Sequence, residues 1–188
     1  ALGMGAMVTV IDVNIDRLRF LEGILHERLT TLASNRRNIY EAVRRAEVVI
    51  GAVLVPGARA PVLVSEEMVA AMAPGSVVLD IAVDQGGCIE TIHVTSHSDP
   101  TYVLHDIVHY GVPNVPAAVP RTATLALSNA TLPYVLELAD AGLANAVRAN
   151  RALARGVNTL RGHLVHSAVA RSFCREPVPL EQVLAEGA

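Results

Sequence analysis

Short, continuous apolar runs alternate with segments of helical periodicity over the first 120 residues of the chain. Three of these runs are typical of strands buried on both faces, at Met7–Val13, at Glu47–Val53 and from Ser76 onward. A short extended piece is predicted at Leu29–Ala33, and Thr101–Leu104 is expected to add one more strand. Strands that alternate with helices at this spacing predict βαβ units and a parallel sheet with right-handed crossovers.

Helical periodicity fills the gaps between these runs. Asn14 can cap a first helix, whose apolar side chains recur at helical spacing: Ile15, Leu18, Leu21 and Leu25. A second helix is predicted from about Arg36. A third runs from its cap at Ser65 to Met72, and Pro74–Gly75 ends it.

The alternation stops after about Val119. Two Ala-rich helices are predicted beyond it, at Leu125–Leu138 and Leu143–Leu153, with Gly142 as the stop between them. The tail from Asn158 onward has no βαβ rhythm, so we expect it to lie outside the sheet.

Composition narrows the classes of function. The chain is 52% apolar, and its fifteen basic residues are all arginine, which excludes a mechanism that needs an internal lysine, such as a Schiff base or a P-loop. A formal charge of −3 does not indicate a nucleic-acid partner. Cys88 and Cys174 make no disulfide framework, which favours the reducing cytoplasm. No apolar run has the length of a bilayer span, and no signal peptide or membrane anchor is visible.

The first six residues, Ala1–Ala6, look like the last turn of a helix and its glycine stop, and no initiator methionine is present. We therefore expect the chain to be cut from a longer protein. A dinucleotide-binding sheet needs Gly-x-Gly-x-x-Gly after its first strand, and Gly3-Met4-Gly5 is no substitute because it precedes a strand. We expect the sheet to lack its first strand and its glycine loop.

Asp12 lies where a buried strand ends and a helix begins. In dinucleotide-binding sheets an acid at this place accepts hydrogen bonds from the adenosine ribose, and its charge repels a 2′-phosphate, which favours NAD over NADP. The alternative interpretation is an acid that interacts with the helix dipole.

Asp84 follows the strand that starts at Ser76, and Gln85-Gly86-Gly87 lets the backbone turn beside it. Ligands of parallel sheets bind outside the carboxyl ends of the strands, so Asp84 is a candidate for chemistry. Asp80 is expected to be structural, held by a buried hydrogen bond.

Two histidines imitate a metal motif. His105-Asp106-Ile107-Val108-His109 has the spacing of His-Glu-x-x-His, but a strand leads into it, so we expect a sheet-edge loop and no metal site. Cys88 is expected to be a small buried filler.

Three segments resemble bacterial alanine dehydrogenase: 52–61 (AVLVPGARAP), 80–88 (DIAVDQGGC) and 129–139 (NATLPYVLELA). The resemblance runs over essentially the whole chain, and the alpha subunits of nicotinamide nucleotide transhydrogenase share a looser form of the second segment. It implies an α/β fold with a Rossmann-like doubly wound parallel sheet. It further implies a partial NAD-binding domain at 1–120. Residues 121–188 would then form a helical return segment, made up of a connecting helix and the C-terminal part of the substrate domain.

The resemblance also implies roles for individual residues. It places Asp12 on the adenosine ribose with Arg17 beside it, Ser34 near the adenine, and Asp84 as the catalytic carboxylate. It further implies that Val53 and Leu54 line the cofactor groove. The residues that it places beside the nicotinamide are Ile81, Ala82, Val83, Asp84, Val112, Pro113, Asn114 and Val115.

The implied reaction is the reversible oxidative deamination of L-alanine to pyruvate and ammonia with NAD, in a cytoplasmic homohexamer. The family's substrate-binding arginine, catalytic lysine and catalytic histidine belong to an N-terminal domain that this sequence lacks, so we expect the isolated chain to be inactive. Two alternatives stay open: a transhydrogenase-like protein that binds NAD(H), and a non-catalytic oligomerisation fragment.

Overall fold

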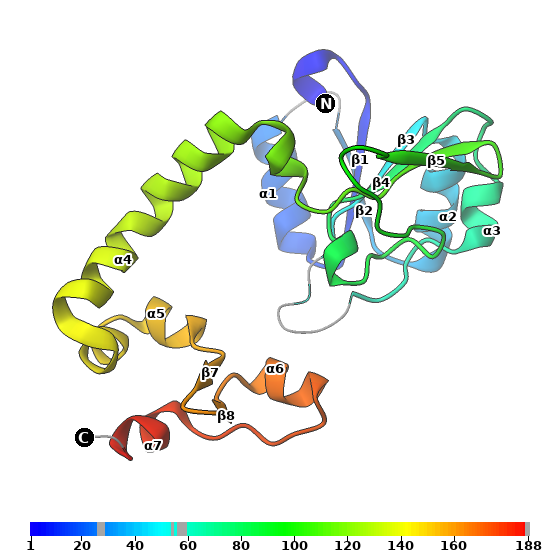
Figure 1. Cartoon of the computed structure of the whole chain (residues 1–188). Helices are drawn as coiled ribbons and strands as arrows, with labels where there is room; N and C mark the ends of the chain where they lie inside the picture. The colour runs from blue at the N-terminus through cyan, green and yellow to red at the C-terminus, as the bar shows by residue number, and fades with distance from the viewer. Residues whose placement is uncertain (26–28, 54, 56–59, 187–188) are drawn as a thin grey trace. The chain divides into compact units, whose positions relative to one another are not determined.

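The structure, a computed structural model, describes residues 1–25, 29–53, 55 and 60–186 (Figure 1). The chain forms two compact units. One comprises 1–54 and 60–113 and is here called the strand unit; the other comprises 55–59 and 114–188 and is called the helical unit.

The strand unit contains parallel strands connected by helices, as the alternating pattern predicts. Its elements are β1 (Val8–Asp12), α1 (Ile15–Leu25), β2 (Leu29–Ala33), α2 (Arg36–Arg45), β3 (Val48–Gly51), α3 (Glu66–Ala70), β4 (Val77–Asp80), β5 (Thr101–Leu104) and β6 (Ile107–Tyr110). β1 pairs with β2 in parallel, and a second sheet has the order β3-β4-β6-β5, in which only β5 is antiparallel to its neighbour. The expected α/β class with parallel strands is confirmed.

One prediction about this sheet is wrong. Residues 105–109 were expected to form a sheet-edge loop, but β6 lies between β4 and β5 inside the sheet. His105 and Asp106 form the tight turn before it, with φ of 55° and 61°. Non-glycine residues seldom adopt this left-handed conformation, although aspartate and histidine do so more often than most. The turn was hidden because it contains no glycine.

The core of the strand unit lies on one face of the second sheet. Val78 of β4 and Ile107 of β6 are fully buried there against apolar side chains of α2 and α3, among them Ile39, Val43, Met68 and Val69. Both helices are capped as their sequences predict: Asn35 Oδ1 accepts from the Asn38 backbone N–H, and Ser65 Oγ accepts from that of Met68.

The opposite face of this sheet is left open. Val48 and Ile50 of β3 point to it and are 53% and 54% exposed, and their register partners Val77 and Leu79 are only half-buried. Parallel sheets are normally covered on both faces, so an apolar face of this kind is unusual.

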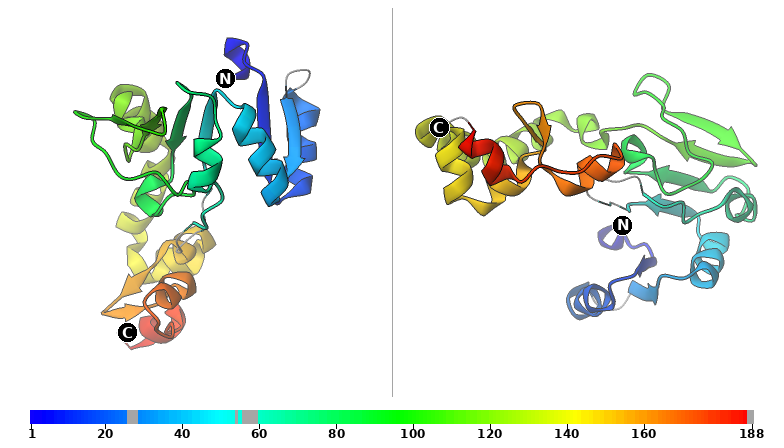
Figure 2. Two further views of the ribbon diagram at one scale, coloured as in Figure 1. Left: turned by 90° about the vertical axis from the view of Figure 1, so that its right-hand side faces the viewer. Right: turned by 90° about the horizontal axis from the view of Figure 1, so that it is seen from below.

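The two sheets share no backbone hydrogen bond among the described residues, and Figure 2 shows them as separate sets of arrows. In the part of the chain that the structure describes, β1 pairs only with β2 and β3 only with β4. α2 connects the two sheets: it contacts β1 as well as α3, and Ile11 of β1 packs against the common core.

The helical unit contains the helices α4 (Pro120–Ala149), α5 (Arg151–Gly156), α6 (Ser167–Ser172) and α7 (Leu180–Ala185). Between α5 and α6 lies a hairpin of two short strands, β7 (Thr159–Leu160) and β8 (His163–Leu164), with two residues each. Gly142 interrupts α4 with φ 70° and ψ 160°, as its predicted role of stop requires. The predicted helix at Leu143–Leu153 is in fact two, because Asn150 ends α4 and caps α5 by accepting from the N–H groups of Ala152 and Leu153. None of the helices in the described part is long and apolar enough to cross a bilayer.

Candidate functional site

A buried carboxylate organises the loop that follows β4. Asp80 is 1% exposed and accepts three backbone N–H groups: Ala82 to Oδ1 at 2.9 Å, and Cys88 and Ile89 to Oδ2 at 2.6 and 3.3 Å. Such bonds offset the cost of burying the charge. The structural role expected for Asp80 is confirmed.

Two glycines make room for this carboxylate. A Cβ at Gly51 of β3 would lie 2.8 Å from Asp80 Cγ and 2.8 Å from Cys88 Sγ. A Cβ at Gly87, where φ is +64°, would lie 3.0 Å from Asp80 Oδ2. The backbones of β3 and of the returning loop therefore pack directly against the Asp80 side chain.

Asp84 lies at the exposed tip of this loop. β4 ends at Asp80, and Asp84 follows in a short 3-10 helix at Val83–Gln85, while the neighbouring Ala82 and Val83 are buried. The carbonyl of Ala82 accepts from the N–H groups of both Gln85 and Gly87, at 2.9 and 3.1 Å. The exposed carboxylate is thus carried by a turn with an anchored base.

Several other candidate residues follow the carboxyl ends of the same sheet. The register pairs Gly51 with Asp80 and Leu79 with Tyr110, so β3, β4 and β6 end at one edge. The candidates at this edge are the half-buried Val53, exposed Ile81, buried Val112 and half-buried Pro113. Leu54 lies outside the described residues. Asn114, with φ 53°, and Val115 belong to the helical unit.

Asp12 and Ser34 meet at the carboxyl edge of the first sheet. The Ser34 N–H donates to the Asp12 carbonyl at 2.9 Å, and Asp12 Oδ1 accepts from the Asn14 N–H at 2.7 Å. Arg17 lies in the first turn of α1, where its guanidinium carbon lies 4.8 Å from the centroid of the Phe20 ring. The structure thus brings Asp12 and Ser34 together, while Arg17 contacts its own helix.

The two histidines of the metal-like motif are engaged elsewhere. His105 Nε2 lies 2.7 Å from Glu66 Oε1. His109 is fully buried in β6: Nδ1 donates to the Ile107 carbonyl at 2.9 Å, so Nε2 accepts from the Thr91 hydroxyl, also at 2.9 Å. Among the described residues, no three His, Cys, Asp or Glu side chains are grouped closely enough to hold a metal ion.

Sequence reasoning missed a stack of rings beside β6. Tyr102 of β5 lies between His93 and His109, with centroid distances of 3.9 and 4.8 Å. Burial is the main cause that lowers the pKa of His109 below its usual value, and the charges of His93 and His105 lower it further. The pairing of Tyr102 with His109 across β5 and β6 could have been found had β6 been recognised.

Cys88 is buried, in agreement with the expected filler role. Burial and the nearby charge of Asp80 raise its pKa to about 11. Cys88 therefore stays a neutral thiol at physiological pH and is unsuited to act as a nucleophile.

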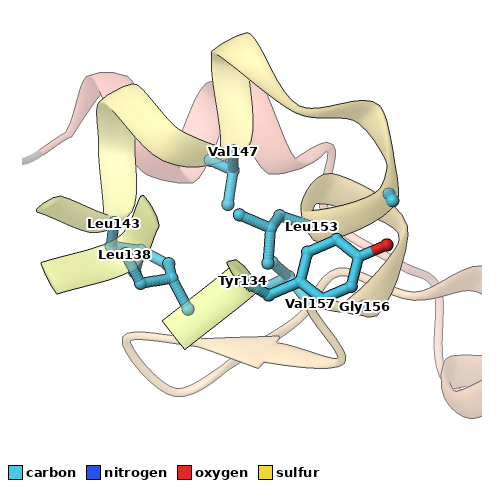
Figure 3. Close-up of a pocket in the computed structure, with 8 residues that line it drawn as sticks. Tyr134, Leu138, Leu143, Val147, Leu153, Gly156 and Val157 are labelled. Carbon is cyan, nitrogen blue, oxygen red and sulfur yellow. The ribbon is translucent and has the colours of Figure 1, made fainter. Parts of the chain in front are cut away.

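The helical unit has a pocket of about 500 Å³ between the two segments of α4 and α5 (Figure 3). Its lining is apolar apart from the Tyr134 hydroxyl: Tyr134, Leu138, Leu143, Val147, Ala152, Leu153, Gly156 and Val157. The Tyr134 hydroxyl is the one polar side-chain group in this lining.

Comparison with known proteins assigns the fold to a family. The family model described as "Alanine dehydrogenase/PNT, C-terminal domain" matches residues 1–167. The chain belongs to this family. The resemblance carried by segments 52–61, 80–88 and 129–139 is thereby confirmed.

Relatives in the alanine dehydrogenase family are similar over nearly the whole chain. The alanine dehydrogenase of Bacillus subtilis is 53% identical over 185 residues, which cover 98% of this chain and 49% of that protein. That of Methanococcus maripaludis is 51% identical over 187 residues, 99% of this chain and 50% of that protein. The chain thus spans about half the length of the curated relatives it matches.

Solved structures agree with this assignment. An L-alanine dehydrogenase superposes with a TM-score of 0.81 at 53% identity, covering 92% of this chain and 48% of the other. A transhydrogenase from Sinorhizobium meliloti superposes with a TM-score of 0.68 at 25% identity, covering 89% and 44%. The dehydrogenase is the nearer of these two structures by both measures.

Gly51→Ala tests the packing around Asp80. The added Cβ has to displace the Asp80 carboxylate and the Cys88 sulfur, so we expect the free energy of unfolding to fall by about 1–3 kcal/mol. The matched control is Gly23→Ala in α1, where a Cβ meets no atom within 4 Å and should stabilise by up to about 1 kcal/mol. Urea denaturation of the two variants measures both effects; equal stabilities would contradict the tight packing.

His109 should make the stability of the chain depend on pH. Since its folded-state pKa lies below the unfolded value of 6.5, the unfolded chain binds the proton first as the pH falls. The contribution of His109 to the free energy of unfolding is therefore fully present above pH 6.5. It is lost progressively as the pH falls from 6.5 to the lowered folded-state pKa. Urea denaturation at a series of pH values should show this loss, and His109→Asn should reduce it. Parallel curves for the parent and the variant would refute the assignment.

Proposed function

We propose that the chain is the cofactor-binding half of an enzyme that uses NAD to interconvert L-alanine with pyruvate and ammonia. The observation that carries this proposal is the 53% identity to the Bacillus subtilis alanine dehydrogenase over 98% of the chain. The transhydrogenase alternative is supported by only 25% identity.

The adenosine end of NAD binds at the edge where β1 and β2 end. Oδ1 of Asp12 is held by the Asn14 N–H, and Oδ2 accepts no hydrogen bond from another described residue. A carboxylate fixed in this way fits a ribose diol, which offers two hydroxyl donors. The backbone N–H of Ser34 donates a hydrogen bond to the Asp12 carbonyl. In this proposal Ser34 lies near the adenine and Arg17 lies beside the ribose.

The nicotinamide end binds at the edge where β3, β4 and β6 end. NAD supplies the hydride acceptor when bound. The residues of the strand unit that would line the groove or flank the nicotinamide are Val53, Ile81, Ala82, Val83, Asp84, Val112 and Pro113. Gly51 ends β3 at this edge, and because it has no Cβ the strand can pack directly against the side chains of Asp80 and Cys88.

Asp84 acts on the substrate. When hydride leaves Cα, positive charge develops on the carbon–nitrogen bond, and a nearby carboxylate stabilises it and orients the attacking water. Asp84 is exposed, as a group that touches substrate must be, and its turn is fixed at the base by the Ala82 carbonyl.

The other half of the enzyme supplies what this chain lacks. The chain has no lysine. In this proposal the substrate-binding arginine, the catalytic lysine and the catalytic histidine of the family come from its N-terminal domain. The isolated chain is therefore inactive. Residues 1–120 form most of the cofactor domain, and 121–188 return to the substrate domain.

The doubly wound sheet is completed by a strand that these 188 residues do not contain. This strand pairs in parallel with β1 on one side and β3 on the other, and the helix that follows it covers the apolar face around Val48 and Ile50. Among the described residues, β1 pairs only with β2 and β3 only with β4, and these free edges of β1 and β3, together with the exposure of that face, support this arrangement. The phosphate-binding glycine loop connects this strand to its helix.

The activity can be tested in a chimera in which this chain replaces the matching half of the Bacillus subtilis alanine dehydrogenase. We expect the chimera to form NADH from L-alanine, and the isolated chain to form none. Asp84→Asn should lower the turnover number of the chimera by roughly 10² to 10⁴, because the amide cannot stabilise the charge. Asp99→Asn, at an exposed aspartate outside the site, is the matched control. Unchanged turnover in Asp84→Asn would remove Asp84 from the mechanism.

Cofactor preference tests Asp12 in the same chimera. Asp12→Ser removes the charge that repels a 2′-phosphate, so the ratio of kcat/KM for NADP to that for NAD should rise by about 10- to 100-fold. Asp16→Asn is the control, because Asp16 is exposed on α1 and pairs with Arg19. If the ratio stays the same in Asp12→Ser, the adenosine ribose binds elsewhere.

A further inference from the structure

The loop that follows β4 is hydrogen-bonded at both of its ends to the same side chain, that of Asp80. Asp80 Oδ1 accepts from Ala82 just after the strand, and Oδ2 accepts from Cys88 and Ile89, where the loop comes back. Asp84 lies midway between these two attachment points. A single carboxylate therefore closes the whole loop.

The returning end of the loop is also anchored to the rest of the strand unit. The carbonyl of Cys88 accepts from the N–H groups of Leu63 and Val64, at 2.8 and 3.1 Å, and the Glu90 N–H donates to the Val64 carbonyl at 2.9 Å. The first part of the loop has one such anchor, from the Ile81 N–H to the Gly51 carbonyl at 2.8 Å. Between these anchors, the loop 82–87 bonds only to itself and to Asp80 among the backbone and side-chain hydrogen bonds of the described residues.

We propose that Asp80 is a positioning residue, whose buried carboxylate fixes the turn that presents Asp84 to the substrate. The role of Asp84 rests on the proposed function, whereas the closure of the loop does not. The requirement is for a carboxylate: an amide at position 80 would direct an N–H₂ group at backbone N–H groups, because only one of its two terminal atoms accepts. Glutamate is too long, because Gly51 and Gly87 pack directly against the side chain.

Hydrogen exchange of the chain itself tests the loop. In Asp80→Asn, we expect the amides of the loop, Ala82 and Gln85 to Ile89, to exchange at least about 10-fold faster, while those of Val78 and Ile107 in β4 and β6 keep their rates. A purely structural contribution would instead raise exchange in the loop and the strands together. That result, or unchanged loop exchange, would overturn the proposal.

A milder variant covers the case in which Asp80→Asn does not fold. Gly87→Ala keeps the carboxylate but places a Cβ 3.0 Å from Oδ2 at a position with φ +64°. It should accelerate exchange in the same loop amides without affecting β4 and β6. Gly75→Ala is the matched control, since φ there is +83° but a Cβ meets nothing within 4 Å.

The link to catalysis is tested by a double-mutant cycle in the chimera. Asp80→Asn should lower the turnover number by about 10- to 100-fold, because a displaced carboxylate loses its alignment with the substrate. In the Asp84→Asn background the same substitution should have no further effect, since the group that it positions is already lost. Additive losses would show that Asp80 does not act through Asp84. An inactive parent chimera would count against the proposed function, and the exchange experiment would still decide how the loop is held.

Discussion

The site depends on the burial of one carboxylate, that of Asp80, between the end of β3 and the loop that returns after β4. A buried charge is costly unless hydrogen bonds replace the lost water, and here three backbone N–H groups do so. The benefit is mutual, because the loop leaves the sheet ladder and its amides need other acceptors. The same arrangement explains the glycines at 51 and 87 and the inert thiol of Cys88. One interaction thus sets the local sequence, the shape of the loop and the exposure of Asp84.

The sheet around this site is stabilised on one side only. α2 and α3 bury Val78 and Ile107, while Val48 and Ile50 on the other face remain half exposed. The strand unit nevertheless holds both sheets together, because α2 contacts β1 as well as the common core.

Sequence patterns located the strands better than the turns. Leu29–Ala33 was predicted to the residue, and the strands β1, β3 and β4 were found because continuous apolar residues are typical of parallel strands. The prediction that these runs are buried on both faces is wrong for β1 and β3, because Val48 and Ile50 of β3 are 53% and 54% exposed and no residue of β1 is buried. β6 was missed because its turn, His105-Asp106, contains no glycine and its buried His109 looks polar in the sequence. That histidine is tolerated because Ile107 and Thr91 satisfy both ring nitrogens. In the same way, Asn150 looked like the interior of a helix, although its side chain caps the next one. Such local hydrogen bonds leave no periodic signal.

The sequence could predict a residue of the proposed site only where that residue follows directly after a recognisable strand. Strand ends indicated Asp12 and Asp84 as candidates, but the strand stops at Asp80, and only the structure shows that Asp84 is carried by a loop. This difference matters for the proposed chemistry. A carboxylate at a strand end is rigid but recessed, whereas one on an unanchored loop is accessible but mobile. Closure of the loop by Asp80 combines access with rigidity, which is what a group needs if it is to meet a substrate in a fixed position.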